Sequence, residues 1–92
     1  MATLTVTPNP APANSEVSIS GSGYSTDNLP ILRVTYPDGE VVESGTWVWG
    51  NGTLGPMPWV VEEAGAYHLE TLQRKGKSRR YTKLATAELT VI

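Results

Sequence analysis

The chain has 92 residues, of which 39% are hydrophobic and 17% are charged, and its formal net charge is -2. This composition is typical of a globular protein, and the length suits a single domain with one modest core over residues 1–92. Because the sequence contains no cysteine, it excludes a disulfide framework, a thiolate zinc site and a cysteine nucleophile. The slightly acidic balance disfavours general nucleic-acid binding.

The first part of the chain alternates apolar and polar residues with a period of two, which indicates β-strands. We expect strands over residues 3–7 and 16–20, joined by a proline-rich segment over residues 8–14. That segment should run extended, because proline has no amide hydrogen to donate to a sheet. Gly21-Ser22-Gly23 should break the second strand as a bulge, and residues 24–30 should form a loop.

A hairpin is expected in the middle of the sequence. Residues 31–36 should form a strand that turns at Pro37-Asp38-Gly39-Glu40 and pairs back with residues 41–44. The Asp-Gly pair supplies the positive φ that a tight hairpin requires. Trp47-Val48-Trp49 should follow as a short aromatic strand bounded by glycines.

Two prolines precede the next apolar run. Pro56 and Pro58 lie just before Trp59-Val60-Val61, so this part of the chain should lie at a sheet edge or in a loop. A turn is expected over residues 62–65. Tyr67 follows it at the place where sandwich domains often have a corner tyrosine, whose hydroxyl bonds back to the main chain.

The last part of the chain is expected to be a long hairpin. A strand through residues 67–72 should lead to a polar tip over residues 74–80, centred on Gly76, and a final strand over residues 81–92. The pattern contains no helix longer than one turn and no internal repeat.

Together these segments make seven or eight short strands with turn signals every 8–12 residues. The predicted fold is therefore all-β, a sandwich of two antiparallel sheets with one core between them. Ten inward-facing residues should fill that core: Leu4, Val6, Val17, Ile19, Leu32, Val34, Tyr67, Leu69, Leu89 and Val91.

Five segments spread over nearly the whole chain carry a resemblance to a known family. They cover residues 4–8, 17–24, 34–39, 64–69 and 87–91. In these segments the chain resembles the compact bacterial and phage immunoglobulin-like domains. The resemblance implies an immunoglobulin-like sandwich and a role in attachment, as in virion surface proteins, adhesins and carbohydrate-associated modules. The tryptophan segment and the basic tip depart from the family's pattern, and the absence of cysteine separates the chain from antibody domains.

The first candidate site is the tip of the last hairpin, which holds five of the seven basic residues. Arginine can grip a carboxylate or phosphate with two parallel hydrogen bonds, so the tip could meet an acidic partner. The alternative is a solvated turn that only keeps the chain soluble. Tyr81 is the one neighbouring aromatic residue, so nucleic acid is disfavoured as the partner. The five residues are Arg74, Lys75, Lys77, Arg79 and Arg80.

The tryptophans are the second candidate site. Trp47 and Trp49 should share one face of a strand, with Trp59 close by. Exposed tryptophans would serve as a platform for a sugar ring or as a hot spot for a protein partner. The alternative is that they supply bulk to the core, since the chain lacks phenylalanine. We expect at least one of Trp47 and Trp49 to be a core residue.

We find no catalytic, cofactor or metal site in the sequence and expect the protein not to be an enzyme. His68 is the only histidine and should face solvent, and no serine stands in the sequence context of a nucleophile elbow. The residues Asp38-Gly39-Glu40 lack the spaced acids of a calcium loop. Asn51-Gly52-Thr53 matches a glycosylation sequon but is interpreted as a turn.

The leading functional hypothesis is a structural binding protein that decorates a phage head. Its partner would be the major capsid protein or another virion protein lattice, with self-association on that lattice as a further contact. A carbohydrate-binding or adhesion module that binds surface glycans is one alternative, and a tail or baseplate component is another.

The expected location is the virion surface, after synthesis in the host cytoplasm, because no leader segment follows Met1 and no apolar run is long enough to span a membrane. The alternative is an extracellular module of a longer protein.

Overall fold

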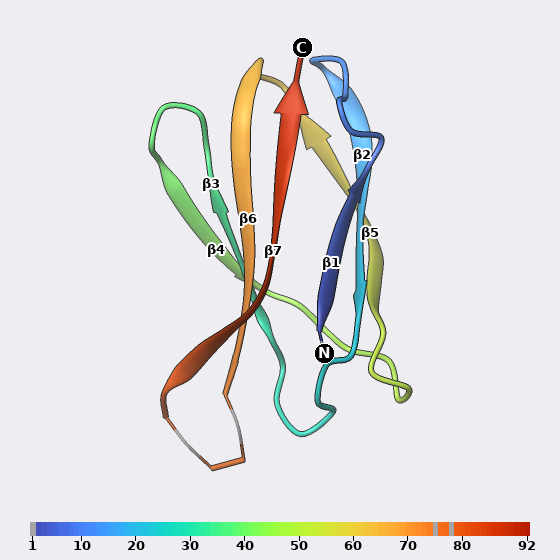
Figure 1. Cartoon of the computed structure of the whole chain (residues 1–92), viewed down its shortest axis with the longest axis vertical. Helices are drawn as coiled ribbons and strands as arrows, with labels where there is room; N and C mark the ends of the chain where they lie inside the picture. Colours follow the sequence, from blue (N-terminus) through green and yellow to red (C-terminus); the bar gives the residue numbers. More distant parts are fainter. Residues whose placement is uncertain (1, 75, 78) are drawn as a thin grey trace.

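Seven antiparallel strands form two sheets that pack against each other (Figure 1). The computed structural model describes residues 2–74, 76–77 and 79–92. Within these residues there is no helix, as the sequence predicts. The strands are β1 (Thr3–Thr7), β2 (Ser15–Ser22), β3 (Ile31–Thr35), β4 (Val41–Gly45), β5 (Leu54–Val61), β6 (Gly65–Arg74) and β7 (Tyr81–Val91).

The two sheets have the orders β1-β2-β5 and β4-β3-β6-β7. The chain passes from one sheet to the other after β2, β4 and β5, and stays within a sheet at the β3–β4 and β6–β7 hairpins. This arrangement confirms the predicted all-β sandwich and is compatible with an immunoglobulin-like sandwich.

The core lies between the sheets and follows the alternation of each strand. In β1, for example, Leu4 and Val6 are buried while their neighbours are exposed. All ten residues that the sequence assigned to the core are buried. The core also includes residues that the pattern did not single out, namely Ala11, Tyr24, Leu54 and Val61.

The proline-rich segment bridges the two sheets. Ala11 forms a parallel bridge with Val91: its amide donates to the Thr90 carbonyl (2.9 Å), and its own carbonyl accepts from the Ile92 amide (2.8 Å). The side chain of Asn9 extends this pairing, donating to the Glu88 carbonyl (2.7 Å) and accepting from the Thr90 amide (3.1 Å). The segment that follows β1 is therefore held against the edge strand β7.

The irregularity expected at Gly21 is present, but it does not end the strand. A register shift of the kind a bulge produces lies between Ile19 and Gly21, and β2 continues to Ser22. Glycine is required there, since a Cβ on Gly21 would collide with the carbonyl oxygen of Thr3 on the neighbouring strand. Pro56 and Pro58 lie within β5, which is an edge strand, so the first of the two predicted placements is confirmed.

The expected aromatic strand at residues 47–49 is wrong. Only Val48 forms a bridge, to Leu54, and the chain around it is a loop. A tight turn closes this loop, with the Gly52 amide donating to the Trp49 carbonyl (2.9 Å) and the Trp49 amide to the Thr53 carbonyl (2.9 Å). Since the chain reverses at once, there is no room for a strand to extend.

The corner tyrosine is confirmed. The hydroxyl of Tyr67 donates to the main-chain carbonyl of Glu63 (2.8 Å), and the residue is only 1% exposed. Burial raises the pKa of this hydroxyl above its ordinary value. The bond fixes the β5–β6 turn, where the chain crosses between the sheets.

Replacing the corner hydroxyl tests its contribution. Tyr67→Phe should lower the free energy of unfolding by about 1–2 kcal/mol, because it leaves the Glu63 carbonyl without its donor. Tyr81→Phe is the matched control, since this exposed tyrosine donates no hydroxyl hydrogen bond within the described part of the chain. Chemical denaturation measures both, and equal stabilities of the two variants would contradict the assignment.

The buried tyrosines also predict a pH dependence. Burial raises the pKa of both Tyr24 and Tyr67 in the folded protein. Above about pH 10 the unfolded chain therefore loses protons that the folded chain keeps, so stability should fall as pH rises. The free energy of unfolding should be measured at several values between about pH 8 and pH 11. These two tyrosines should cause no fall in it at about pH 8. The decline should be shallower in Tyr67→Phe.

Candidate functional site

The tryptophan loop, residues 46–53, connects β4 to β5 and presents two exposed indoles. Trp47 is 46% exposed and Trp49 is 53% exposed. Their rings meet edge to face, with centroids 4.6 Å apart and planes at 83°. The indole N–H of Trp49 donates to the carbonyl of Gly55 (3.0 Å), which fixes this ring against the start of β5.

The expectation that Trp47 or Trp49 would be a core residue is therefore wrong. Val48, which points the opposite way, is the residue that packs against the core. The core takes its aromatic volume from Tyr24 and Tyr67 instead. Both indoles are left on the surface, where hydrophobic side chains of this size mark an interaction site when they cluster.

Leu29, in the β2–β3 loop, is a further exposed hydrophobic residue. The amide of Thr46 donates to the carbonyl of Pro30 (3.0 Å), which continues the β3–β4 pairing by one step, and one more step of the same register would place Leu29 opposite Trp47. Leu29 is 66% exposed. We call Leu29, Trp47 and Trp49 the tryptophan surface.

The basic tip, residues 74–80, joins β6 to β7 as predicted. Lys77, Arg79 and Arg80 are exposed, and the guanidinium of Arg74 lies 5.7 Å from the centre of the Tyr81 ring. Lys75, the remaining predicted residue, lies outside the described residues. The tip and the tryptophan loop occupy the same end of the sandwich, on opposite sides of it (Figure 1).

Side-chain hydrogen bonds connect the base of the basic tip to the β2–β3 loop. The side-chain amide of Asn28 donates to the carbonyls of Arg74 (3.1 Å) and Gly76 (2.9 Å). Gln73, which is buried, donates to the carbonyls of Ser25 (2.7 Å) and Asn28 (2.6 Å). These bonds hold the base of the hairpin in place.

Trp59 lies elsewhere, in contact with other rings. It packs edge to face against Tyr36 (6.3 Å between centroids) and Tyr67 (5.5 Å). Tyr36 and Tyr67 also meet each other, at 5.3 Å. The structure therefore brings Trp47 and Trp49 together, and it places Trp59 in a separate aromatic cluster.

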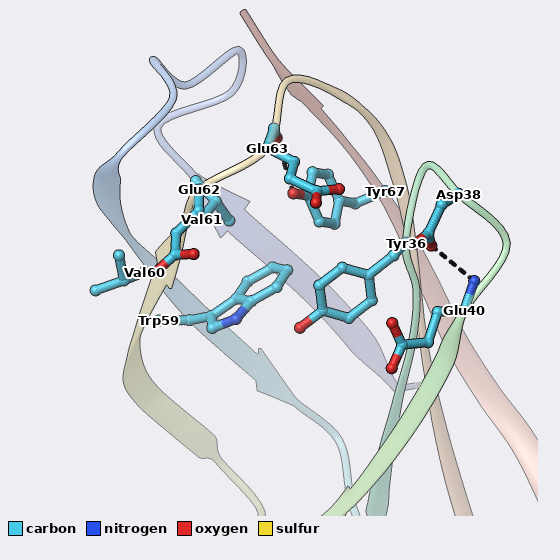
Figure 2. Close-up of a pocket in the computed structure, with 9 residues that line it drawn as sticks. All are labelled: Tyr36, Asp38, Glu40, Trp59, Val60, Val61, Glu62, Glu63 and Tyr67. Carbon is cyan, nitrogen blue, oxygen red and sulfur yellow. Dashed lines mark hydrogen bonds between the residues drawn. The ribbon is translucent and has the colours of Figure 1, made fainter.

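This cluster forms the wall of a pocket with a volume of about 310 Å³ (Figure 2). Two turns supply four acidic residues around it: the β3–β4 hairpin gives Asp38 and Glu40, and the β5–β6 turn gives Glu62 and Glu63. We call it the acidic aromatic pocket. Its lining residues are Tyr36, Asp38, Glu40, Trp59, Val60, Val61, Glu62, Glu63 and Tyr67.

This pocket is not predicted from the sequence. The pattern predicts each of the two turns only as a turn, and it groups Trp59 with the other tryptophans. A usable signal existed, because acids in two turns would meet if both turns close the same end of the sandwich. Recognising it requires the strand order, which brings β5 and β3 to opposite walls of one opening.

His68 belongs to a ladder of charges on the outer face of the four-stranded sheet. Its Nδ1 contacts the Glu88 carboxylate directly across the β6–β7 pair, and its Nε2 lies 3.8 Å from Glu70. Glu70 also faces Arg33 (3.8 Å) and Lys83 (3.6 Å). Alternating charges on neighbouring strands stabilise a sheet through such cross-strand pairs.

In the described part of the chain, no three histidine or acidic side chains gather in a way that could hold a metal ion. The same residues include no helix long and apolar enough to cross a membrane. Neither protein-family models nor curated protein sequences give a match for this chain. Its function must therefore be argued from the geometry of the surfaces above.

The contribution of the Trp49 indole hydrogen bond to stability can be measured by comparison with Trp47. Trp49→Phe should lower the free energy of unfolding by about 1 kcal/mol more than Trp47→Phe, because only Trp49 donates an indole hydrogen bond to the buried Gly55. Both changes remove similar apolar area from exposed positions. Chemical denaturation compares the two, and a larger loss for Trp47→Phe would contradict the role of this bond.

Proposed function

We propose that the chain is a non-enzymatic attachment domain that binds the surface of a large protein assembly through its tryptophan surface. The observation that carries this proposal is the exposure of Trp47 and Trp49 side by side. Tryptophan is the residue most enriched at the energetic centres of protein interfaces. The hydrogen bond from Trp49 to Gly55 holds its ring in place before binding, so less ordering is needed when a partner docks.

The resemblance to phage and bacterial immunoglobulin-like domains supports a virion protein lattice as the partner, with the phage head as the leading assembly. The domain would then be made in the host cytoplasm and carried on the virion surface. A tail or baseplate lattice would be recognised by the same chemistry. The rigid two-sheet body supports this function because it presents a fixed surface that repeats with the lattice.

A glycan-binding function is the second candidate, because exposed indoles also stack on sugar rings. The geometry of the pair favours protein over sugar. Trp47 and Trp49 stand at 83° to each other, so they do not form one continuous flat platform. A shaped protein surface fits such a wedge better than a planar face of a sugar does.

Binding to capsids tests the attachment function. The purified chain should co-sediment with capsids that lack it, and Trp47→Ala should weaken that binding by about tenfold or more, as expected for a central tryptophan. Trp47 is the residue to change because Trp49 also holds the loop together. Val41→Ala is the control, since Val41 is 53% exposed on the edge strand β4.

Two results would contradict the proposal. One is a failure to co-sediment with head, tail or baseplate particles at any salt concentration. The other is equal binding by Trp47→Ala and Val41→Ala. The glycan function replaces the attachment function under a different result. In that case the chain binds no particle but binds a glycan array, and Trp47→Ala loses the glycan signal.

A further inference from the structure

The acidic aromatic pocket combines the two features that recognise an organic cation. Its rings stand nearly perpendicular to one another, with Trp59 at 82° to Tyr36 and 85° to Tyr67, so they wall the opening from different directions (Figure 2). Ring faces attract ammonium and guanidinium groups electrostatically, and several rings around one cation form an aromatic cage. The surrounding carboxylates add a negative electrostatic potential, which also attracts cations.

The four carboxylates of the pocket are not neutralised from within. The ion pairs of the described residues join Arg33, His68 and Lys83 to acids on the outer sheet face, and none reaches Asp38, Glu40, Glu62 or Glu63. The Asp38 carboxylate accepts a hydrogen bond from the Glu40 amide (2.9 Å), which leaves its charge in place. The opening therefore holds unbalanced negative charge beside its aromatic walls.

The volume of the pocket limits what fits in it. At about 310 Å³ it lies at the small end of the range of ligand sites, roughly ten times the liquid volume of one water molecule. That space suits the end of one basic side chain or a small organic cation.

We infer that the acidic aromatic pocket binds an ammonium or guanidinium group, and that its occupant is the basic tip of a second copy of this chain. The positive charge of the molecule is concentrated at that tip, which holds five of the seven basic residues. Arg33 and Lys83, the other two, face carboxylates of their own sheet. Lys77 and Arg79 are exposed and have no ion pair within the described residues.

The two surfaces lie at opposite ends of one strand. Glu62 and Glu63 come just before β6, and the basic tip follows directly after it. A strand of ten residues spans about 30 Å, so a tip cannot reach the pocket of its own copy. The contact must therefore join the tip of one copy to the pocket of another. A head-to-tail row makes this contact once between neighbours, and an antiparallel two-fold pair makes it twice.

This inference goes beyond the proposed attachment function and does not rest on it, because it is tested on the purified chain alone. On a lattice, a weak contact between neighbours would add to the affinity of each copy for the particle.

Sedimentation velocity over a concentration series is the first experiment. The purified chain should associate as its concentration rises, and added salt should reverse this, because screening shortens the range of charge attraction to about 10 Å at 0.1 M. Glu63→Gln and Lys77→Glu should each weaken association by about fivefold or more. Asp27→Asn, which removes one negative charge from the exposed β2–β3 loop and not from the pocket, should not weaken it.

A mixing experiment tests whether the tip of one copy pairs with the pocket of another. Glu63→Lys alone and Lys77→Glu alone should each be deficient, because each pairs like charges at every contact. An equal mixture of the two variants should regain association, since each tip then finds a pocket of opposite charge. If the variants associate like the unmodified chain, or if the mixture stays as deficient as its parts, the inference is overturned.

A titration with free arginine tests cation binding by the pocket separately from the identity of its occupant. Titrating arginine into dilute protein should shift the NMR signal of the Trp59 indole, and the shift should be smaller in Glu63→Gln than in Asp27→Asn. If arginine binds but the chain remains a monomer up to millimolar concentration, the second copy is wrong as the occupant. If the Trp59 signal does not respond and the chain does not associate, the whole inference fails. Neither result bears on binding to capsids.

Discussion

The hydrogen bond from Tyr67 to the Glu63 carbonyl is the constraint around which one end of the molecule is organised. It fixes the turn through which the chain passes from the three-stranded to the four-stranded sheet. The same turn carries Glu62 and Glu63, and the ring of Tyr67 contacts both Tyr36 and Trp59. One buried side chain thus joins the two sheets, shapes the aromatic wall and places half of the acids of the pocket.

The alternation of apolar residues carried most of the information about the fold. Since side chains of a strand point alternately to its two faces, the positions of Leu4 and Val6, or of Leu89 and Val91, decide which face is buried. The predicted strands outside residues 47–49 and the ten predicted core residues agree with the structure for this reason. The corner tyrosine is predictable from its position shortly after Gly65, because sandwich domains often have a tyrosine there whose hydroxyl bonds back to the main chain.

Which residues of the tryptophan loop are buried could not be predicted from the alternation of side chains alone. Alternation at residues 47–49 says that Val48 faces away from its neighbours, but it does not say which side is the core. That choice is made by the turn closed at Gly52 and by Leu54, which is fully buried and bridges Val48. The pocket was missed for a related reason: its acids come from turns more than twenty residues apart in sequence, and only the sheet order brings them together.

The placement of the surfaces has a consequence for how they can be used together. The β4–β5 loop, which carries Trp47 and Trp49, and the β6–β7 hairpin, which carries the basic tip, lie on opposite sides of one end of the sandwich (Figure 1). The β3–β4 and β5–β6 turns, which supply the acids of the pocket, lie at the other end. A partner that covers the β4–β5 side leaves the β6–β7 hairpin accessible. Attachment through apolar contact and association through charge can therefore occur in one copy at the same time. Their salt dependence differs, because screening weakens charged contacts at a surface far more than the burial of indoles.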